Sequence, residues 1–330
     1  MDILKGLTIL LVIIGHVTRI YTNASSIPQL AESRFIEIIS GWIYSSHMPL
    51  FMGMSGYIYY ILKSERGKYK EMWTFAKKKF LRLIVPYLFA YPLFVFLPLY
   101  LLNSLPQSAY SASDFFYNYL LVLDVRHLWF IVSLFSIFII YNFFWNSIYI
   151  NPFSYLCLFL SISVLTNYIK LPDILQITMT CRFILWFHVG CILSIVLSKI
   201  SMLKNGWIFW GGLILNIFFF SLSQKFYSCD YIQIPSALIS SMCGILMMLS
   251  LSFSVQKLNM FIWGLSYSKD SYGIYLTHMS VVWSIAHFTQ NLPITPLIVV
   301  PVSTLVTLLT SLIVCRLLRL MHLKFIIGEI

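Results

Sequence analysis

The 330-residue chain has 22 Lys and Arg against 11 Asp and Glu, so only 10% of its residues are charged while 59% are hydrophobic, and its net charge is +11. Soluble globular proteins carry about 25% charged residues, and this chain lacks the polar residues to cover a core of its size. The composition excludes an ordinary soluble enzyme, a disordered chain and a disulfide-rich secreted module, and it predicts a polytopic membrane protein.

Ten stretches of the sequence are long and apolar enough to cross a bilayer, which takes about 20 residues. We expect helices, because backbone polar groups in lipid must be satisfied within the segment. The prediction is therefore an all-α membrane protein with about ten transmembrane helices, forming one domain over residues 1–330 with no appended soluble domain. The predicted spans are 3–20, 42–62, 83–102, 128–147, 152–169, 180–198, 206–222, 235–254, 271–289 and 295–317.

The basic residues predict the orientation of these spans. Eight of the 22 basic residues lie in the connection from Lys63 to Arg82. If the N-terminus is cytoplasmic, 16 basic residues lie inside and six lie outside. Cytoplasmic loops retain Lys and Arg, so we expect both termini to be cytoplasmic.

The first span holds ionisable residues where the bilayer disfavours them, and such residues are candidate functional groups. Lys5 and His16 are eleven residues apart and share one helical face, about 16 Å apart along the axis. A neutral His16 can accept the proton of an alcohol; the alternative is a hydrogen-bonded packing histidine. Asp2 and Lys5 also fit a membrane boundary, and Arg19 also fits a side chain that extends outward to the headgroups.

Further polar residues lie beside the second and fourth spans. His47 follows two serines in the second span, and Asp124, Arg126, His127 and Trp129 open the fourth. The second group also fits an ordinary polar helix start, with an acidic residue near the positive end of the helix. Because the histidines and the six cysteines lack metal-ligand spacing, we predict no metal site.

The third span begins with a basic pair. Lys79 and Arg82 are three residues apart, hence neighbours on one helical face. A lysine with an arginine suits phosphate groups at a cytoplasmic helix start. Juxtamembrane basic residues also anchor helices to anionic lipid headgroups, and the spacing does not separate these two roles.

Taken in order, these motifs resemble the acyltransferase-3 family of integral membrane acyltransferases, and most closely its bacterial sugar O-acetyltransferases. The resemblance covers essentially the whole chain. It is carried by residues 2–16 in the first span, 47–51 and 55–57 in the second, Lys79, Arg82, Pro86 and Tyr87 at the third, 127–130 at the fourth and 272–278 in the ninth.

The resemblance implies transfer of an acyl group, usually acetyl from cytoplasmic acetyl-CoA, to a carbohydrate hydroxyl. His16 corresponds to the family's catalytic histidine, and Lys79 with Arg82 corresponds to an Arg-x-x-Arg motif linked to the acyl donor. Lys5 stands where the family usually has an arginine. The lysines at positions 5 and 79 keep the positive charge but lose the bidentate geometry of a guanidinium.

We therefore expect a multi-pass enzyme of the bacterial cytoplasmic (inner) membrane that uses acyl-CoA as a substrate and binds no cofactor tightly. The expected acceptor is a surface polysaccharide such as an O-antigen, or a lipid-linked glycan. Membrane lipid and a separate periplasmic or extracellular protein are further expected partners, and nucleic acid is not. The candidate residues are His16, Asp124 and His127 for catalysis, Lys5, Lys79 and Arg82 for the donor, and Asp2, His47, Arg126, Trp129, Tyr275 and His278 elsewhere in the site.

In this hypothesis His16 is the general base, and an acidic or carbonyl group, with Asp124 as the candidate, orients its ring. A transporter or flippase of lipid-linked sugar, or another membrane protein of polysaccharide assembly, is the alternative function. Transporters often show internal repeats and helices broken at matched positions. The sequence shows neither, although Pro86, Pro92 and Pro98 predict kinks in the third span.

Overall fold

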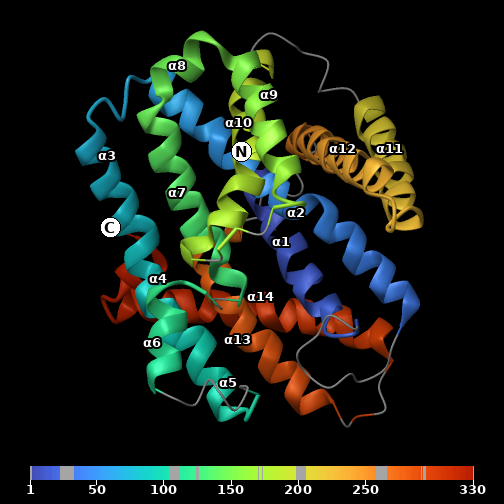
Figure 1. Ribbon diagram of the computed structural model, residues 1–330. Coiled ribbons are helices and arrows are strands. Elements are labelled where there is room, and N and C mark those ends of the chain that lie inside the picture. The colour runs from blue at the N-terminus through green and yellow to red at the C-terminus, as the bar shows by residue number, and fades with distance from the viewer. Residues whose placement is uncertain are drawn as a thin grey trace.

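The computed structural model describes residues 2–22, 33–104, 112–123, 126–169, 171–172, 174–197, 206–257, 266–290, 292 and 295–329. Every regular element in these ranges is a helix, which confirms the predicted all-α fold (Figure 1). The main helices are α1 (Asp2–Arg19), α2 (Arg34–Tyr60), α3 (Met72–Lys79), α4 (Val85–Ala90), α5 (Leu97–Leu101), α6 (Ala112–Leu120), α7 (Trp129–Phe143), α8 (Trp145–Ile150), α9 (Pro152–Leu165), α10 (Ile177–Leu197), α11 (Gly206–Lys225), α12 (Asp230–Lys257), α13 (Ser271–Thr289) and α14 (Pro296–Leu320).

Each of the ten predicted spans lies mainly on helix. The fourth differs from the prediction because a turn at Phe144 divides it between α7 and α8, and the fifth because α9 ends at Leu165, four residues before the predicted end. In the described part of the chain, six stretches are long and apolar enough to cross a membrane by length and composition, so the protein is a polytopic membrane protein. Helices α1, α2, α9 and α13 also match predicted spans but are shorter or more polar than these six. The cytoplasmic placement of both termini remains a prediction.

The third predicted span runs as one helical stretch from Met72 to Leu101. Two π-helical segments, η2 (Phe80–Ile84) and η3 (Tyr91–Phe96), interrupt it. Pro92 has no N–H to donate to the carbonyl of Leu88, and the hydroxyl of Tyr119 in α6 donates to that carbonyl instead, at 2.8 Å. Pro92 lies within η3, whereas Pro86 and Pro98 lie at the starts of the α-helical segments that follow η2 and η3. Arg82 lies within the π-helical turn η2, an irregularity often found at functional sites.

Helices α2 and α10 pack so closely that glycine is required where they cross. A Cβ atom added to Gly56 would lie 1.9 Å from the carbonyl oxygen of Phe187, and one added to Gly190 would lie 1.9 Å from that of Gly53. Small residues allow such close backbone approach between membrane helices. The contact holds α2 firmly against α10, and α2 carries several residues of the site described below.

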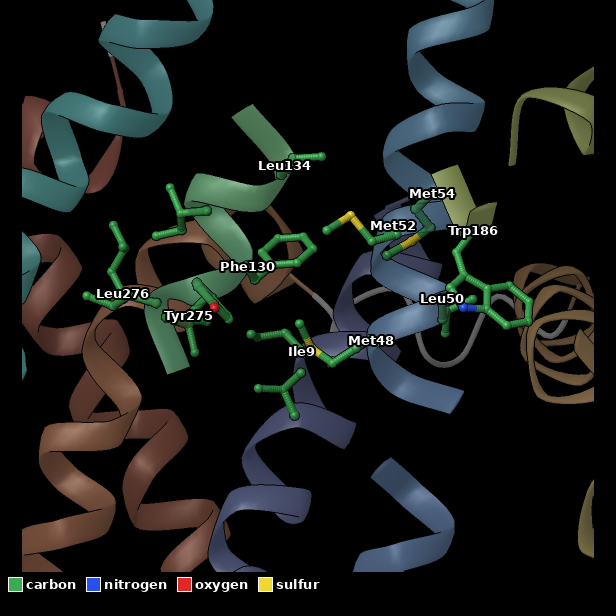
Figure 2. Packing of buried hydrophobic residues seen from close by; sticks show 14 of the residues in the cluster. Ile9, Met48, Leu50, Met52, Met54, Phe130, Leu134, Trp186, Tyr275 and Leu276 are labelled. Atoms are coloured by element: carbon green, nitrogen blue, oxygen red, sulfur yellow. The ribbon is translucent and has the colours of Figure 1, made fainter. Parts of the chain in front are cut away.

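The centre of the bundle is an apolar core shared by helices that are distant in sequence. Figure 2 shows α1 contributing Ile9, α2 contributing Met48 and Met52, α7 contributing Phe130 and α13 contributing Tyr275. The rings of Phe130 and Tyr275 lie 5.5 Å apart. This core fixes the relative positions of the four segments that carry the histidines of the site.

Candidate functional site

Four histidines from different parts of the sequence meet in the bundle, and we call them the histidine cluster. They are His16 of α1, His47 of α2, His127 of the short helix η5 (Arg126–Leu128) and His278 of α13. The ring centroids of His16 and His278 are 5.1 Å apart, those of His127 and His278 are 5.0 Å apart, and those of His16 and His127 are 6.2 Å apart. The structure thus brings together residues that the sequence places in four separate motifs.

His16 is the half-buried member of the cluster, whereas the other three histidines are buried. Its Nδ1 atom lies 2.9 Å from the hydroxyl oxygen of Tyr44 in α2. Gly15 permits the close approach of α1 to α2, because a Cβ atom there would lie 3.4 Å from the Tyr44 ring and 3.1 Å from Ile43. The guanidinium of Arg19 lies 4.7 Å above the Tyr44 ring, a cation–π distance.

Backbone carbonyl groups fix two of the remaining histidines. Nδ1 of His47 donates to the carbonyl of Ile43 at 2.8 Å, and Nδ1 of His278 donates to that of Tyr275 at 2.8 Å. The His47 ring packs against Tyr44, with centroids 4.7 Å apart. Nε2 of His278 is buried without a hydrogen-bond partner in the described part of the chain, so it is free to interact with a ligand or with a proton-bearing group.

His127 is held differently from the other histidines. Neither of its ring nitrogens has a hydrogen-bond partner within the described residues, although backbone groups of Tyr275 and Leu276 lie close to the ring. The hydroxyl of Tyr275 donates to the His127 carbonyl, which ties the start of α7 to α13. Over the described ranges, no group of three or more His, Cys, Asp or Glu side chains is arranged to hold a metal ion.

A cavity of about 180 Å³ lies on one side of the histidine cluster, and we call it the Lys79 cavity. Lys5, Lys79 and Arg82 line it, so the structure brings the three predicted donor-binding residues to one place. Its walls are otherwise mainly apolar and include Tyr275. Because the Tyr275 ring also packs 5.7 Å from His127, this tyrosine connects the cavity with the histidine cluster.

Two of the three basic residues of the Lys79 cavity also line a second space. An adjoining hollow of about 510 Å³ shares Lys79 and Arg82 and adds Lys78, together with Glu329 near the end of the chain. Nζ of Lys79 lies 3.5 Å above the ring of Phe138. The two spaces together combine a basic entrance with an apolar interior, which suits a ligand that has a phosphorylated end and an uncharged end.

A further cavity of about 210 Å³ lies beside Tyr44, and we call it the Tyr44 cavity. Along α2, Tyr44, Ser45 and Pro49 line the Tyr44 cavity, and residues from Phe51 to Tyr59 line the Lys79 cavity. The two cavities therefore lie along successive stretches of α2. The walls of the Tyr44 cavity include Asn167, Arg182, Phe183, Trp186, Gln233 and Ser241.

The remaining predicted site residues lie around this arrangement. Asp2 is exposed and forms an ion pair of 3.1 Å with Lys5, and Arg126 begins η5 beside His127. Trp129 packs against Phe183 of the Tyr44 cavity, with centroids 4.9 Å apart. Asp124 lies outside the described residues, and the partner that the structure shows for His16 is the hydroxyl of Tyr44.

Sequence reasoning did not identify Tyr44 or Arg182 as site residues. One signal was available for Tyr44, because a spacing of three residues places it on the same helical face as His47. Arg182 carried no such signal. His188, in contrast, is satisfied away from the cluster by the Tyr141 hydroxyl at 2.7 Å and the Pro152 carbonyl at 2.8 Å, which indicates a packing role.

Comparison with known protein families gives one match. A family model described as an acyltransferase domain, Acyl_transf_3, matches residues 1–316. No curated protein and no solved structure matches the chain.

Proposed function

The chain belongs to the acyltransferase-3 family, and from that premise we propose that it transfers an acetyl group from cytoplasmic acetyl-CoA to a hydroxyl of a cell-envelope or exported carbohydrate. It is a multi-pass membrane acyltransferase. Acetyl as the acyl group, CoA as its carrier, the carbohydrate and the bacterial cytoplasmic membrane are parts of the proposal.

One observation carries the proposal: His16 lies between two cavities that line successive stretches of α2. On one side it packs 5.1 Å from His278 and 6.2 Å from His127, which contact Tyr275 of the Lys79 cavity. On the other side its Nδ1 contacts Tyr44 of the Tyr44 cavity. This arrangement supports a reaction in which donor and acceptor approach His16 from opposite sides.

The Lys79 cavity and its basic entrance suit the donor. Lys79, Arg82 and Lys78 offer positive charge for the phosphates of coenzyme A, and the apolar interior accommodates the uncharged pantetheine arm and the acyl group. The predicted orientation agrees, because it places Lys5, Lys79 and Arg82 on the cytoplasmic side, where acetyl-CoA is found. Tyr275 then marks the end of the cavity that receives the thioester.

In the proposed reaction, Nε2 of His16 takes the proton of the acceptor hydroxyl, and the hydroxyl oxygen attacks the thioester carbonyl carbon. A C–O ester bond forms, the C–S bond breaks, and the proton on His16 passes to the departing CoA sulfur, which regenerates the histidine. This role needs the tautomer in which Nδ1–H donates to the Tyr44 oxygen and leaves the Nε2 lone pair free. Tyr44 therefore orients the ring.

The test uses purified protein in lipid vesicles, acetyl-labelled acetyl-CoA and candidate glycans. We expect the wild type to release CoA and label the glycan, and His16→Ala to lower transfer by about a hundredfold or more, the usual contribution of a general base. His287→Ala is the control, because this histidine of α13 lies outside the cluster. A His16→Ala variant that folds and still transfers acetyl at the wild-type rate would refute the proposed role.

A further inference from the structure

The Tyr44 cavity has the chemistry of a substrate site, and its walls show which substrate it suits. Four helices surround it: α2 contributes Tyr44, α9 contributes Ser163, α10 contributes Arg182 and Trp186, and α12 contributes Gln233. Asn167, just after α9, completes one wall. Residues so distant in sequence meet here only through the fold, and they combine aromatic with polar side chains, as ligand sites commonly do.

Most polar side chains of the wall already have protein partners. The Ser163 hydroxyl donates to the Arg182 carbonyl at 3.0 Å, and the Asn167 amide donates to the carbonyls of Ser163 and Val164. The Ser241 hydroxyl donates to the Ser45 carbonyl at 2.6 Å. These bonds help to hold the wall in place, and they use the donor hydrogens of these side chains, which leaves only their oxygens as acceptors.

Arg182 differs from these side chains because it has a buried donor group without a partner among the described residues. Its Nε–H is buried without a hydrogen-bond partner among the described residues, and no carboxylate of the described chain forms an ion pair with its guanidinium. The described residues that line the cavity include neither Asp nor Glu. A buried donor without a partner is destabilising, and more so when the group is charged, so this guanidinium suits a ligand that brings the missing anion.

A second cation lies close to the same cavity. The guanidinium of Arg19 covers the ring of Tyr44 at 4.7 Å, and Tyr44 belongs to the cavity wall. One arginine in the wall, a second beside Tyr44 and no described carboxylate in the wall make a positive environment, in which oxyanions bind by bidentate, charge-assisted hydrogen bonds. The rings of Trp186, Phe183 and Tyr44 add flat apolar surface for the C–H faces of a sugar ring.

We propose that the Tyr44 cavity binds the acceptor, and that Arg182 makes it select a carbohydrate that carries an oxyanion. This inference rests on the proposed acyl transfer and extends it to the class of acceptor. The anion is either the carboxylate of an acidic sugar or the phosphate of a lipid-linked glycan. Arg182 binds the anion, the aromatic side chains hold the ring, and the acceptor hydroxyl points past Tyr44 toward His16.

The experiment compares three acceptors of similar size: an oligouronate, its carboxyl-reduced neutral counterpart, and a neutral glycosyl phosphate. Acetyl transfer from labelled acetyl-CoA is measured for each acceptor with wild type, Arg182→Gln, Arg182→Lys and the control Arg66→Gln, which alters an exposed arginine outside the cavity. Binding of each acceptor to purified protein is measured separately, without acetyl-CoA. Thermal denaturation shows that each variant is folded.

We expect the wild type to prefer one anionic acceptor over the neutral one by about tenfold or more, as one charge-assisted hydrogen bond provides. Arg182→Gln should lower that preference by the same factor in both transfer and binding, Arg182→Lys should restore part of it, and Arg66→Gln should leave it unchanged. Preference for the oligouronate indicates an acidic sugar, and preference for the glycosyl phosphate indicates a lipid-linked glycan.

The inference is overturned if the wild type binds and acetylates anionic and neutral acceptors equally well, or if the preference for an anionic acceptor persists in Arg182→Gln.

A failure of the proposed acyl transfer would give a different result. If an anionic acceptor binds in an Arg182-dependent manner but receives no acetyl group, the cavity binds anionic carbohydrate as inferred, while the acyl-transfer proposal fails.

Discussion

Nδ1 of His16 lies 2.9 Å from the hydroxyl oxygen of Tyr44, and this contact joins the histidine of α1 to the wall of a cavity built largely on other helices. A ring that must accept a proton at one nitrogen is held in the correct tautomer by a partner at the other nitrogen. In this protein a phenol occupies the position that a carboxylate or a carbonyl group holds in many histidine-based sites. The arrangement makes Tyr44 a positioning residue whose contribution can be measured.

Tyr44→Phe keeps the ring and removes the hydroxyl, so we expect kcat to fall by about tenfold to a hundredfold while KM for acetyl-CoA changes little. The physical reason is the loss of one hydrogen bond that fixes the His16 ring, since tenfold corresponds to about 1.4 kcal/mol. Steady-state kinetics in lipid vesicles provide the measurement. Tyr57→Phe, on the same helix but outside both cavities, is the control, and an unchanged kcat for Tyr44→Phe would contradict the positioning role.

The helices could be predicted from the sequence because lipid requires long apolar segments, and all ten predicted spans lie mainly on helix. The irregular third span was partly predictable. Pro86, Pro92 and Pro98 indicated kinks, but the π-helical turns that hold Arg82 and follow Ala90 depend on packing against neighbouring helices. The hydroxyl of Tyr119, which replaces a missing helical donor, comes from a separate helix that no local pattern connects with it.

The site was predictable only where a single residue conflicts with its surroundings. His16 stood out because the bilayer disfavours a polar group in an apolar helix, and Lys79 with Arg82 stood out by charge. Tyr44 and Arg182 did not, since a tyrosine and an arginine near a helix end are ordinary in a membrane protein. Tyr44 matters because the fold places it against His16, and Arg182 because the fold places it in the Tyr44 cavity. These contacts between α1, α2 and α10 are not encoded in any local sequence pattern.

The double variant Lys79→Ala/Arg82→Ala tests the Lys79 cavity as the donor site. Removing these two basic side chains should raise KM for acetyl-CoA by about tenfold to a hundredfold, because each charge-assisted hydrogen bond contributes about 1.5–3 kcal/mol, partly screened at the exposed Arg82. The loss should shrink as salt is raised. Lys77→Ala removes an exposed lysine outside both spaces and should leave KM unchanged. Unaltered acetyl-CoA affinity in the double variant would mean that the pair only anchors the helix.

The crossing of α2 and α10 gives a prediction about stability. The Cβ atom added by Gly190→Ala would lie 1.9 Å from the carbonyl oxygen of Gly53, so the two helix backbones must move apart. We expect destabilisation of about 1–3 kcal/mol or more, the range for overpacked sites, seen as a lower Tm in detergent. Gly211→Ala is the matched control, because nothing lies within 4 Å of an added Cβ atom, and alanine favours a helix over glycine. Equal Tm values for the two variants would contradict the required close contact.

The end of the chain makes a pH-dependent contact. Arg319 of α14 donates to the carboxylate of Glu329 at 2.9 Å and also pairs with Asp270, just before α13. The hydrogen bond from Arg319 holds the pKa of the Glu329 carboxyl below its usual range. Because the native state binds this proton less readily than the unfolded state does, the contact stabilises the fold above the ordinary glutamate pKa of about 4.3 and is lost as pH falls through the lower native value.

Glu329→Gln should therefore lower the Tm at pH 7, and the difference from wild type should shrink as the pH is lowered below about 4. Hydrogen exchange over residues 321–329 provides a local readout, since Ile326 and Ile327 of the preceding turn are buried and should exchange faster once the ion pair is lost. Glu65→Gln alters an exposed carboxylate at the end of the π-helical segment η1 (Ile61–Glu65), which follows α2, and should leave this exchange unchanged. Glu329 also borders the basic hollow beside Lys79. If the Tm difference between Glu329→Gln and wild type were equally large at low pH, the shape of the Glu329 side chain, and not its charge, would hold residues 321–329 in place.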